Sequence, residues 1–361
     1  MKIILTVLLL LWLQTGLAQD VYQVLRDDVQ GFAEVKPGVP LVFPRDHLAH
    51  PEYRIEWWYI TSNLKDPQGR DWGLQWTLFR QSLSPETDSA GWDSNQVWMA
   101  HAALTLPDRH VFEQRFARGG IGQAGVSKGD SNGFDAWIDD WRWHSTSASL
   151  FPSQLEFNVA GHQVNMQLDS EAQWVLNGNQ GFSQKSAQGQ ASYYYSQPNI
   201  NLSGTVSVNG ETIELSGRAW LDREWSSQAL AQNQKGWDWF SLHLDDGNKL
   251  MVYQLRHDSG EHWISGSWIA ATGETIALGK DDIALVVQSS STIDTTGNNQ
   301  IDLPLEWTII LPKLGRNLRI KPLYDEQWLG AQFPYWEGVV LVEDSNGQSA
   351  GKGYMELTGY E

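Results

Sequence analysis

The chain has 361 residues, of which 41% are hydrophobic, 12% aromatic and 19% charged, and its formal net charge is −18 at pH 7. The apolar content is high enough for packed cores, which excludes an intrinsically disordered chain. The negative charge argues against nucleic acid and anionic lipid as partners, and the length suits two domains of roughly 150–180 residues each.

The first 18 residues have the pattern of a secretory signal peptide. Lys2 supplies a positive start, residues 3–13 form an apolar run, and the small residues Gly16 and Ala18 precede the expected cleavage site. The run is too short to span a bilayer, and the alternative is a buried N-terminal strand. We therefore expect a secreted or periplasmic protein without stable membrane insertion. The sequence contains no cysteine, so we expect its stability to come without disulfides.

Short alternating segments follow an extended lead-in over residues 19–55, which is interrupted by prolines. A charged, aromatic strand at 56–60 and a period-two segment at 72–80 predict a hairpin whose strands carry Glu56 and Arg80. Further strands are predicted at 97–106, which contains His101, and at 134–143, 155–159, 164–168 and 191–196.

Two hairpins stand out in the second half of the chain. Asn209-Gly210 and Asp246-Gly247 each separate two alternating runs, the strongest short-range signal for a hairpin. Later strands are predicted at 303–311, 318–324, 336–342 and 354–358, and residues 224–234 are the one plausible short helix.

This pattern predicts an all-β protein built from two antiparallel β-barrel or sandwich domains packed together. Pro198 interrupts the strands, so we place the boundary between Tyr195 and Ile200. The predicted domains are residues 19–196 and 197–361.

Several motifs match a known pattern without its structural context. Residues 120–125 fit the dinucleotide fingerprint G-x-G-x-x-G, and residues 125–129 fit the nucleophile elbow G-x-S-x-G, but neither is followed by a predicted helix. His257 and His262 have no third ligand near them in sequence. We therefore expect no cofactor and no metal. His101 is either a hydrogen-bonded core histidine or a ligand-binding residue.

Residues 217–256 hold the densest mixture of acids and indoles in the chain. Asp222 and Glu224 lie beside Trp225, and Asp238 lies between Trp237 and Trp239. Carboxylates favour water and indoles do not, so such a stretch forms either a polar rim on a core or a dry pocket that contains acids.

Longer motifs connect these residues to a known family. They are EWWY at 56–59, GLQWTLFR at 73–80, AHA at 100–102, ASYYYS at 191–196, AWLDREW at 219–225, GWDW at 236–239, YWEG at 335–338 and GYMELTGY at 353–360. From about residue 50 to the C-terminus, the chain resembles the AttH-like, carotenoid 1,2-hydratase-related family of secreted proteins. The resemblance implies two lipocalin-like β-barrel domains.

The same resemblance implies a range of activities. Carotenoid hydratases add water to a terminal alkene, other relatives cyclise polyenes, and the secreted branch is often labelled a predicted hydrolase. Hydratases of the family carry Asp-His-Asn-Trp where this chain has Asp222-Arg223-Glu224-Trp225. This departure puts carotenoid hydration in question for this chain.

We expect one pocket at the domain interface for an elongated apolar ligand, a hydrophobic small molecule or lipid. An acid in such a pocket has a raised pKa and donates a proton, which would start a hydration, isomerisation or cyclisation of an alkene or polyene. The catalytic candidates are Asp222, Glu224 and Asp238, and the ligand-binding candidates are Glu56, Trp58, Arg80, His101, Trp225, Trp237 and Trp239.

Other functions remain open on the sequence alone. The protein is either such an enzyme, a non-catalytic periplasmic carrier of a lipid or other hydrophobic molecule, or a carboxylate-dependent hydrolase. The charged residues also fit buried ion pairs, Glu56 with Arg80 and Asp222 with Arg223 or Arg256. The oligomeric state is not predicted.

Overall fold

A computed structural model describes residues 23–26, 30–130, 132–228, 230–295 and 299–360. The predicted signal peptide, residues 1–18, lies outside the described residues. Two antiparallel β-sheets form the protein, and the all-β prediction is confirmed. None of the described helices is long and apolar enough to cross a bilayer.

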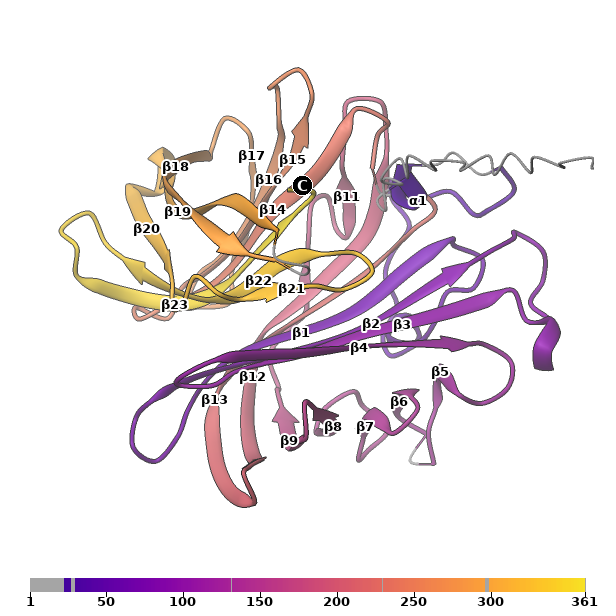
Figure 1. Ribbon diagram of the computed structural model, residues 1–361. Coiled ribbons are helices and arrows are strands. Elements are labelled where there is room, and N and C mark those ends of the chain that lie inside the picture. Colours follow the sequence, from indigo (N-terminus) through magenta and orange to yellow (C-terminus); the bar gives the residue numbers. More distant parts are fainter. Residues whose placement is uncertain (1–22, 27–29, 131, 229, 296–298, 361) are drawn as a thin grey trace, which may run out of the picture.

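The first sheet has thirteen strands in the order β4-β3-β2-β1-β13-β12-β9-β8-β7-β6-β5, with β10 and β11 also paired to β12. All its neighbouring strands are antiparallel, and it is coloured violet to pink in Figure 1. Its strands are β1 (Ile55–Lys65), β2 (Asp71–Ser82), β3 (Gln96–Thr105), β4 (His110–Arg118), β5 (Ala124–Lys128), β6 (Phe134–Ile138), β7 (Trp141–Ser145), β8 (Ser153–Val159), β9 (His162–Asp169), β10 (Val175–Leu176), β11 (Phe182–Gln184), β12 (Ala191–Val208) and β13 (Glu211–Ser226).

The second sheet has ten strands in the order β17-β16-β15-β14-β23-β22-β20-β19-β18, with β21 beside β22. It lies against the first sheet and is coloured orange to yellow in Figure 1. Its strands are β14 (Gln234–Leu244), β15 (Lys249–His257), β16 (Trp263–Ile269), β17 (Thr275–Gly279), β18 (Ala284–Asp294), β19 (Gln300–Leu311), β20 (Arg316–Pro322), β21 (Trp328–Leu329), β22 (Tyr335–Glu343) and β23 (Ser349–Thr358).

Helical segments are short. The described ones are α1 (Gln23–Arg26) and the 3-10 turns η1 (Arg45–His47), η2 (Gly91–Asp93) and η3 (Pro312–Leu314). The predicted helix over residues 224–234 is wrong, because β13 continues to Ser226 and the next strand begins at Gln234. Pairing of β13 with β1 from Ser216 to Ser226 outweighs the weak local preference of this segment.

The chain leaves the first sheet at a later residue than the predicted domain boundary. Pro198 lies inside β12, where the register shifts between Gln197 and Ile200, and such an irregularity accommodates a residue that has no backbone donor. Both β12 and β13 belong to the first sheet. The chain therefore passes to the second sheet between Ser226 and Gln234.

Apolar clusters form the core of each sheet and the contact between the two sheets. One lies on one face of the first sheet around Trp58 and Trp76, and a second lies within the second sheet around Phe240 and Trp307. The third joins the sheets to each other, and it includes Tyr59, Tyr194, Trp220, Trp239, Tyr253, Val339 and Tyr354. One face of each sheet thus packs on that sheet's own core, and part of its other face packs against the other sheet.

Gly73 lies at a close approach between the two sheets. A Cβ atom at this position on β2 would overlap the side chains of Val339 on β22 and Tyr354 on β23. We expect Gly73→Ala to lower the free energy of unfolding by about 1–3 kcal/mol through overpacking. Urea denaturation measures this, with Gly279→Ala as the matched control, because a Cβ there meets only an atom of Asp282 at 4.0 Å. Equal effects of the two substitutions would contradict this view of the interface.

Candidate functional site

A cavity of about 260 Å³ lies between the two sheets. Strands β1 to β4, β12 and β13 of the first sheet line it, and so do β14, β15, β22 and β23 of the second. Leu25 of α1 and Leu230 of the segment between the sheets border it as well. Most of the exposed lining is apolar, so the cavity suits an apolar ligand.

Strand register explains which side chains reach the cavity. Tyr59 on β1 is paired directly with Asp222 on β13 and with Thr77 on β2, and Thr77 is paired with His101 on β3. Residues that are directly opposite in an antiparallel pair share a face, so these four form one row across the sheet. A second row, two residues along, consists of Tyr194, Glu224, Trp57, Phe79, Met99 and Phe116.

The second sheet presents a matching row to the first. Tyr253, Trp239, Glu356 and Glu337 are paired in sequence across β15, β14, β23 and β22. Two hydrogen bonds connect the rows of the two sheets: Tyr59 donates to Glu337 Oε1 at 2.6 Å, and Trp239 Nε1 donates to the hydroxyl oxygen of Tyr194 at 3.2 Å.

The predicted site residues divide into two groups. Trp58, Trp225 and Asp238 do not line the cavity, and the expectation that they share one pocket with the others is wrong. Each is displaced by one residue from a neighbour that does line it, and successive strand residues point to opposite faces. Those that line the cavity are Glu56, Arg80, His101, Asp222, Glu224, Trp237 and Trp239.

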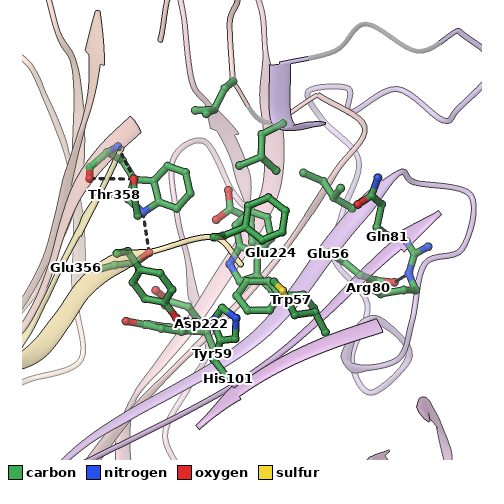
Figure 2. A pocket seen from close by; sticks show the side chains of 18 of the residues that line it. Glu56, Trp57, Tyr59, Arg80, Gln81, His101, Asp222, Glu224, Glu356 and Thr358 are labelled. Carbon is green, nitrogen blue, oxygen red and sulfur yellow. Dashed lines mark hydrogen bonds and ion pairs between the residues drawn. The ribbon is translucent and has the colours of Figure 1, made fainter. Parts of the chain in front are cut away.

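Glu56 and Arg80 form an ion pair at the side of the cavity. Arg223 binds the second oxygen of the same carboxylate, and the Arg80 guanidinium also donates to the carbonyl oxygens of His50 at 2.8 Å and Tyr53 at 2.7 Å. Burial alone would raise the pKa of Glu56, but the two guanidinium groups outweigh burial and hold this pKa well below its ordinary value. Figure 2 shows Glu56 and Arg80 together, apart from Asp222 and His101.

Arg223 and Arg256 do not pair with Asp222. Arg223 binds Glu56, and Arg256 binds Asp238 on the other face of the second sheet. The alternative prediction of an Asp222 ion pair with either arginine is therefore wrong, whereas the predicted pair of Glu56 with Arg80 is confirmed.

Lys185 is a buried cation that the sequence analysis did not identify. Its Nζ atom lies 2.7 Å from Glu224 Oε1 and over the rings of Tyr194 and Tyr253, at 4.9 and 4.4 Å from their centroids. Burial lowers the pKa of Lys185, but the Glu224 carboxylate outweighs this effect and the net shift is upward. Glu224 is therefore neutralised by a cation.

Three buried acids at the centre of the interface lack such a partner among the described residues: Asp222, Glu337 and Glu356. Burial raises the pKa of Asp222 to about 7, against hydrogen bonds from Ser196, from Tyr194 at 2.6 Å and from Trp220 at 2.8 Å. Asp222 is thus partly protonated at neutral pH.

Glu356 and Glu337 face each other on neighbouring strands of the second sheet. Burial raises the pKa of Glu356 to about 8, with the hydrogen bond from Trp237 at 3.0 Å opposing and the Asp222 charge adding to the shift. Burial and the Glu356 charge raise the pKa of Glu337 well above its ordinary value. Both residues lie in motifs noted in the sequence, but only the register shows that they meet.

Metal-ligating side chains do not gather in this cavity. Within the described ranges, no three histidine, aspartate or glutamate side chains form a group that would hold a metal ion. The side chains that line the cavity include carboxyl, phenol, imidazole and indole groups.

Comparison with known proteins identifies the family. The sequence profile described as AttH-like matches residues 34–360. The chain belongs to the AttH-like family. The resemblance found in the sequence is therefore confirmed.

Two solved structures share this AttH-like fold. An AttH protein from Nitrosomonas europaea is 35% identical, with a TM-score of 0.80 over 91% of this chain and 100% of that one. Kievitone hydratase from Nectria haematococca is 15% identical, with a TM-score of 0.66 over 92% of this chain and 97% of that one, a likeness that shows the fold alone. The fold is the two-domain, lipocalin-like one. Among curated proteins, none matches the chain significantly.

Glu56 is expected to be structural. Glu56→Gln removes the negative charge between two buried guanidinium groups, and loss of one partner from a buried ion pair costs about 3–5 kcal/mol of unfolding free energy. Urea denaturation measures the loss. Glu306→Gln, which breaks the more exposed pair of Glu306 with Arg319, is the control and should have little effect. A stable Glu56→Gln protein would contradict this role.

Asp222 should make stability depend on pH. Its pKa of about 7 in the folded protein exceeds the ordinary value of 3.8, so between these pH values the folded state binds more protons than the unfolded state. The stabilising contribution of Asp222 to the free energy of unfolding is therefore fully present below pH 3.8, and it is lost as the pH rises through about 7. In Asp222→Asn, the decline measured by urea denaturation across this range should be smaller. Parallel profiles for the two proteins would refute a raised pKa.

Proposed function

We propose that this AttH-like protein binds an elongated apolar ligand between its two sheets and catalyses an acid-initiated reaction of a carbon–carbon double bond, with Asp222 as the proton donor. One observation carries the proposal. Asp222 is a carboxyl group without a cationic partner among the described residues, it lines an apolar cavity, and its pKa is near neutral. A carboxylic acid that remains protonated at neutral pH is a general acid.

The reaction begins with transfer of the Asp222 proton to one carbon of the double bond. The π electrons form the new C–H bond, the neighbouring carbon becomes a cation, and Asp222 becomes a carboxylate. Indole rings at the cavity wall, those of Trp57 and Trp239, stabilise a nearby cation by ~0.5–2 kcal/mol each. Water then adds to the cation and returns a proton to Asp222, so the net change is hydration.

Loss of a proton from an adjacent carbon, instead of addition of water, gives an isomerised alkene. Attack by a second double bond of the same molecule gives a ring. All three outcomes use the same first step and the same residue. Hydration has the support of the fold shared with kievitone hydratase, whose name describes addition of water.

We also propose that the protein acts outside the cytoplasm. The support is the signal-like pattern of residues 1–18, with a charged start, an apolar run and small residues before the expected cleavage site.

Asp222→Asn tests the proposal, because it keeps the shape of the side chain and removes the acid. General acid catalysis contributes 10²–10⁴-fold, so we expect turnover to fall by at least about 100-fold with ligand binding retained. The assay incubates the protein with extracts rich in alkenes and polyenes and uses mass spectrometry to detect the gain of one water or a shift in retention at constant mass.

Asp238→Asn is the matched control. Asp238 is equally buried, but it is bound to Arg256 on the other face of the second sheet. Its substitution should lower the melting temperature and leave the turnover of the folded protein unchanged. Unchanged turnover in Asp222→Asn would refute the role of Asp222, and ligand binding without any turnover by the unmodified protein would favour a carrier.

A further inference from the structure

His101 is among the residues that line the cavity, and one of its polar atoms has no partner among the described residues. The side chain is fully buried on β3, and its Nδ1 atom lies 2.8 Å from the hydroxyl oxygen of Tyr335. Its Nε2 atom has no hydrogen-bond partner among the described residues. Burial lowers the pKa of His101 to about 3, so the ring is neutral. A buried polar atom without a partner is destabilising, and a bound ligand that forms a hydrogen bond to it would remove that cost.

The charges around the cavity indicate that this ligand group is neutral. Arg80 is bound to Glu56, and Lys185 is bound to Glu224, so neither cation is available to balance a ligand carboxylate or phosphate. A hydroxyl group needs no such cation. It donates and accepts hydrogen bonds, so it pairs with Nε2 in either tautomer of the ring.

The register gives the separation between His101 and the acid. Asp222, Tyr59, Thr77 and His101 lie in one row on the consecutive strands β13, β1, β2 and β3. Three spacings between neighbouring strands amount to roughly 14 Å. A ligand that contacts both ends of this row is elongated, with its hydroxyl group far from its reactive double bond.

We infer that the ligand is an elongated, uncharged apolar alcohol whose hydroxyl group hydrogen-bonds to His101 Nε2 while its other end reaches Asp222. This inference rests on the proposed function of the cavity as a ligand site. In this arrangement His101 selects the neutral polar end of the ligand, and Asp222 donates the proton to its double bond.

Binding of a matched series tests the inference without turnover. Decanol, decanoate and decane share one chain length and differ only at one end, and each is titrated to displace Nile red from the cavity. Decanol should bind more tightly than decanoate. In His101→Leu, the ratio of decanol to decane affinity should fall by roughly five- to tenfold, the value of one hydrogen bond, while decane affinity changes little. His101→Gln, which retains a polar group near the Nε2 position, should restore part of the ratio.

His110→Leu is the control. His110 also has an Nε2 atom without a partner among the described residues, but it does not line the cavity, so the ratio should not change. An equal loss of decanol and decane affinity in His101→Leu would show a packing role and overturn the inference, as would decanoate binding as tightly as decanol. If no member of the series displaces the probe, the ligand site itself is refuted. Loss of turnover in Asp222→Asn tests the proposed chemistry separately.

Discussion

The carboxylate of Glu56, held between Arg80 and Arg223, is the interaction on which the site depends. The three residues lie on β1, β2 and β13, so the ion pairs fix the register of the strands that form the cavity wall. Both arginines also donate to backbone carbonyl oxygens of the lead-in, which binds that irregular segment to the sheet. A single buried anion thus positions three strands and a loop, and the remaining side chains of these strands alternate into the cavity.

Because each of these buried cations pairs with a particular acid, the remaining acids have no cation beside them and retain their protons. Arg80 and Arg223 neutralise Glu56, Lys185 neutralises Glu224, and no cation among the described residues does the same for Asp222. In an apolar enclosure, a carboxyl group without a cation lowers its free energy by retaining its proton. The difference between the ionised and the protonated acids therefore lies in their partners, because both kinds are buried and both lie among aromatic rings.

The sequence predicted the strands and the family more successfully than the site. Period-two runs and Asn-Gly or Asp-Gly turns are local signals, and they identified the all-β fold. The expected site, in contrast, was chosen by the density of acids and indoles, so it included Asp238 together with Trp237 and Trp239. Alternation along a strand separates these neighbours, and strict use of that rule would have removed Asp238. The sequence alone could not place Glu337 and Lys185 at the site, because their positions depend on pairing between distant strands and on packing of the sheets.

The cost of this arrangement is itself an argument for function. Asp222, Glu337, Glu356 and His101 each remove a polar or ionisable group from water, and ordinary hydrophobic residues of similar size would pack the same interface without that cost. Perturbed carboxyl groups that converge on a cavity are typical of reactive sites, whereas paired ions such as Glu56 with its arginines serve structure equally well. An interface that only joined two sheets would have no reason to bury acids without cations together with an imidazole whose Nε2 atom has no partner among the described residues. The proposed ligand site gives a reason for two of these features, the proton on Asp222 and the neutral hydrogen-bonding atom of His101.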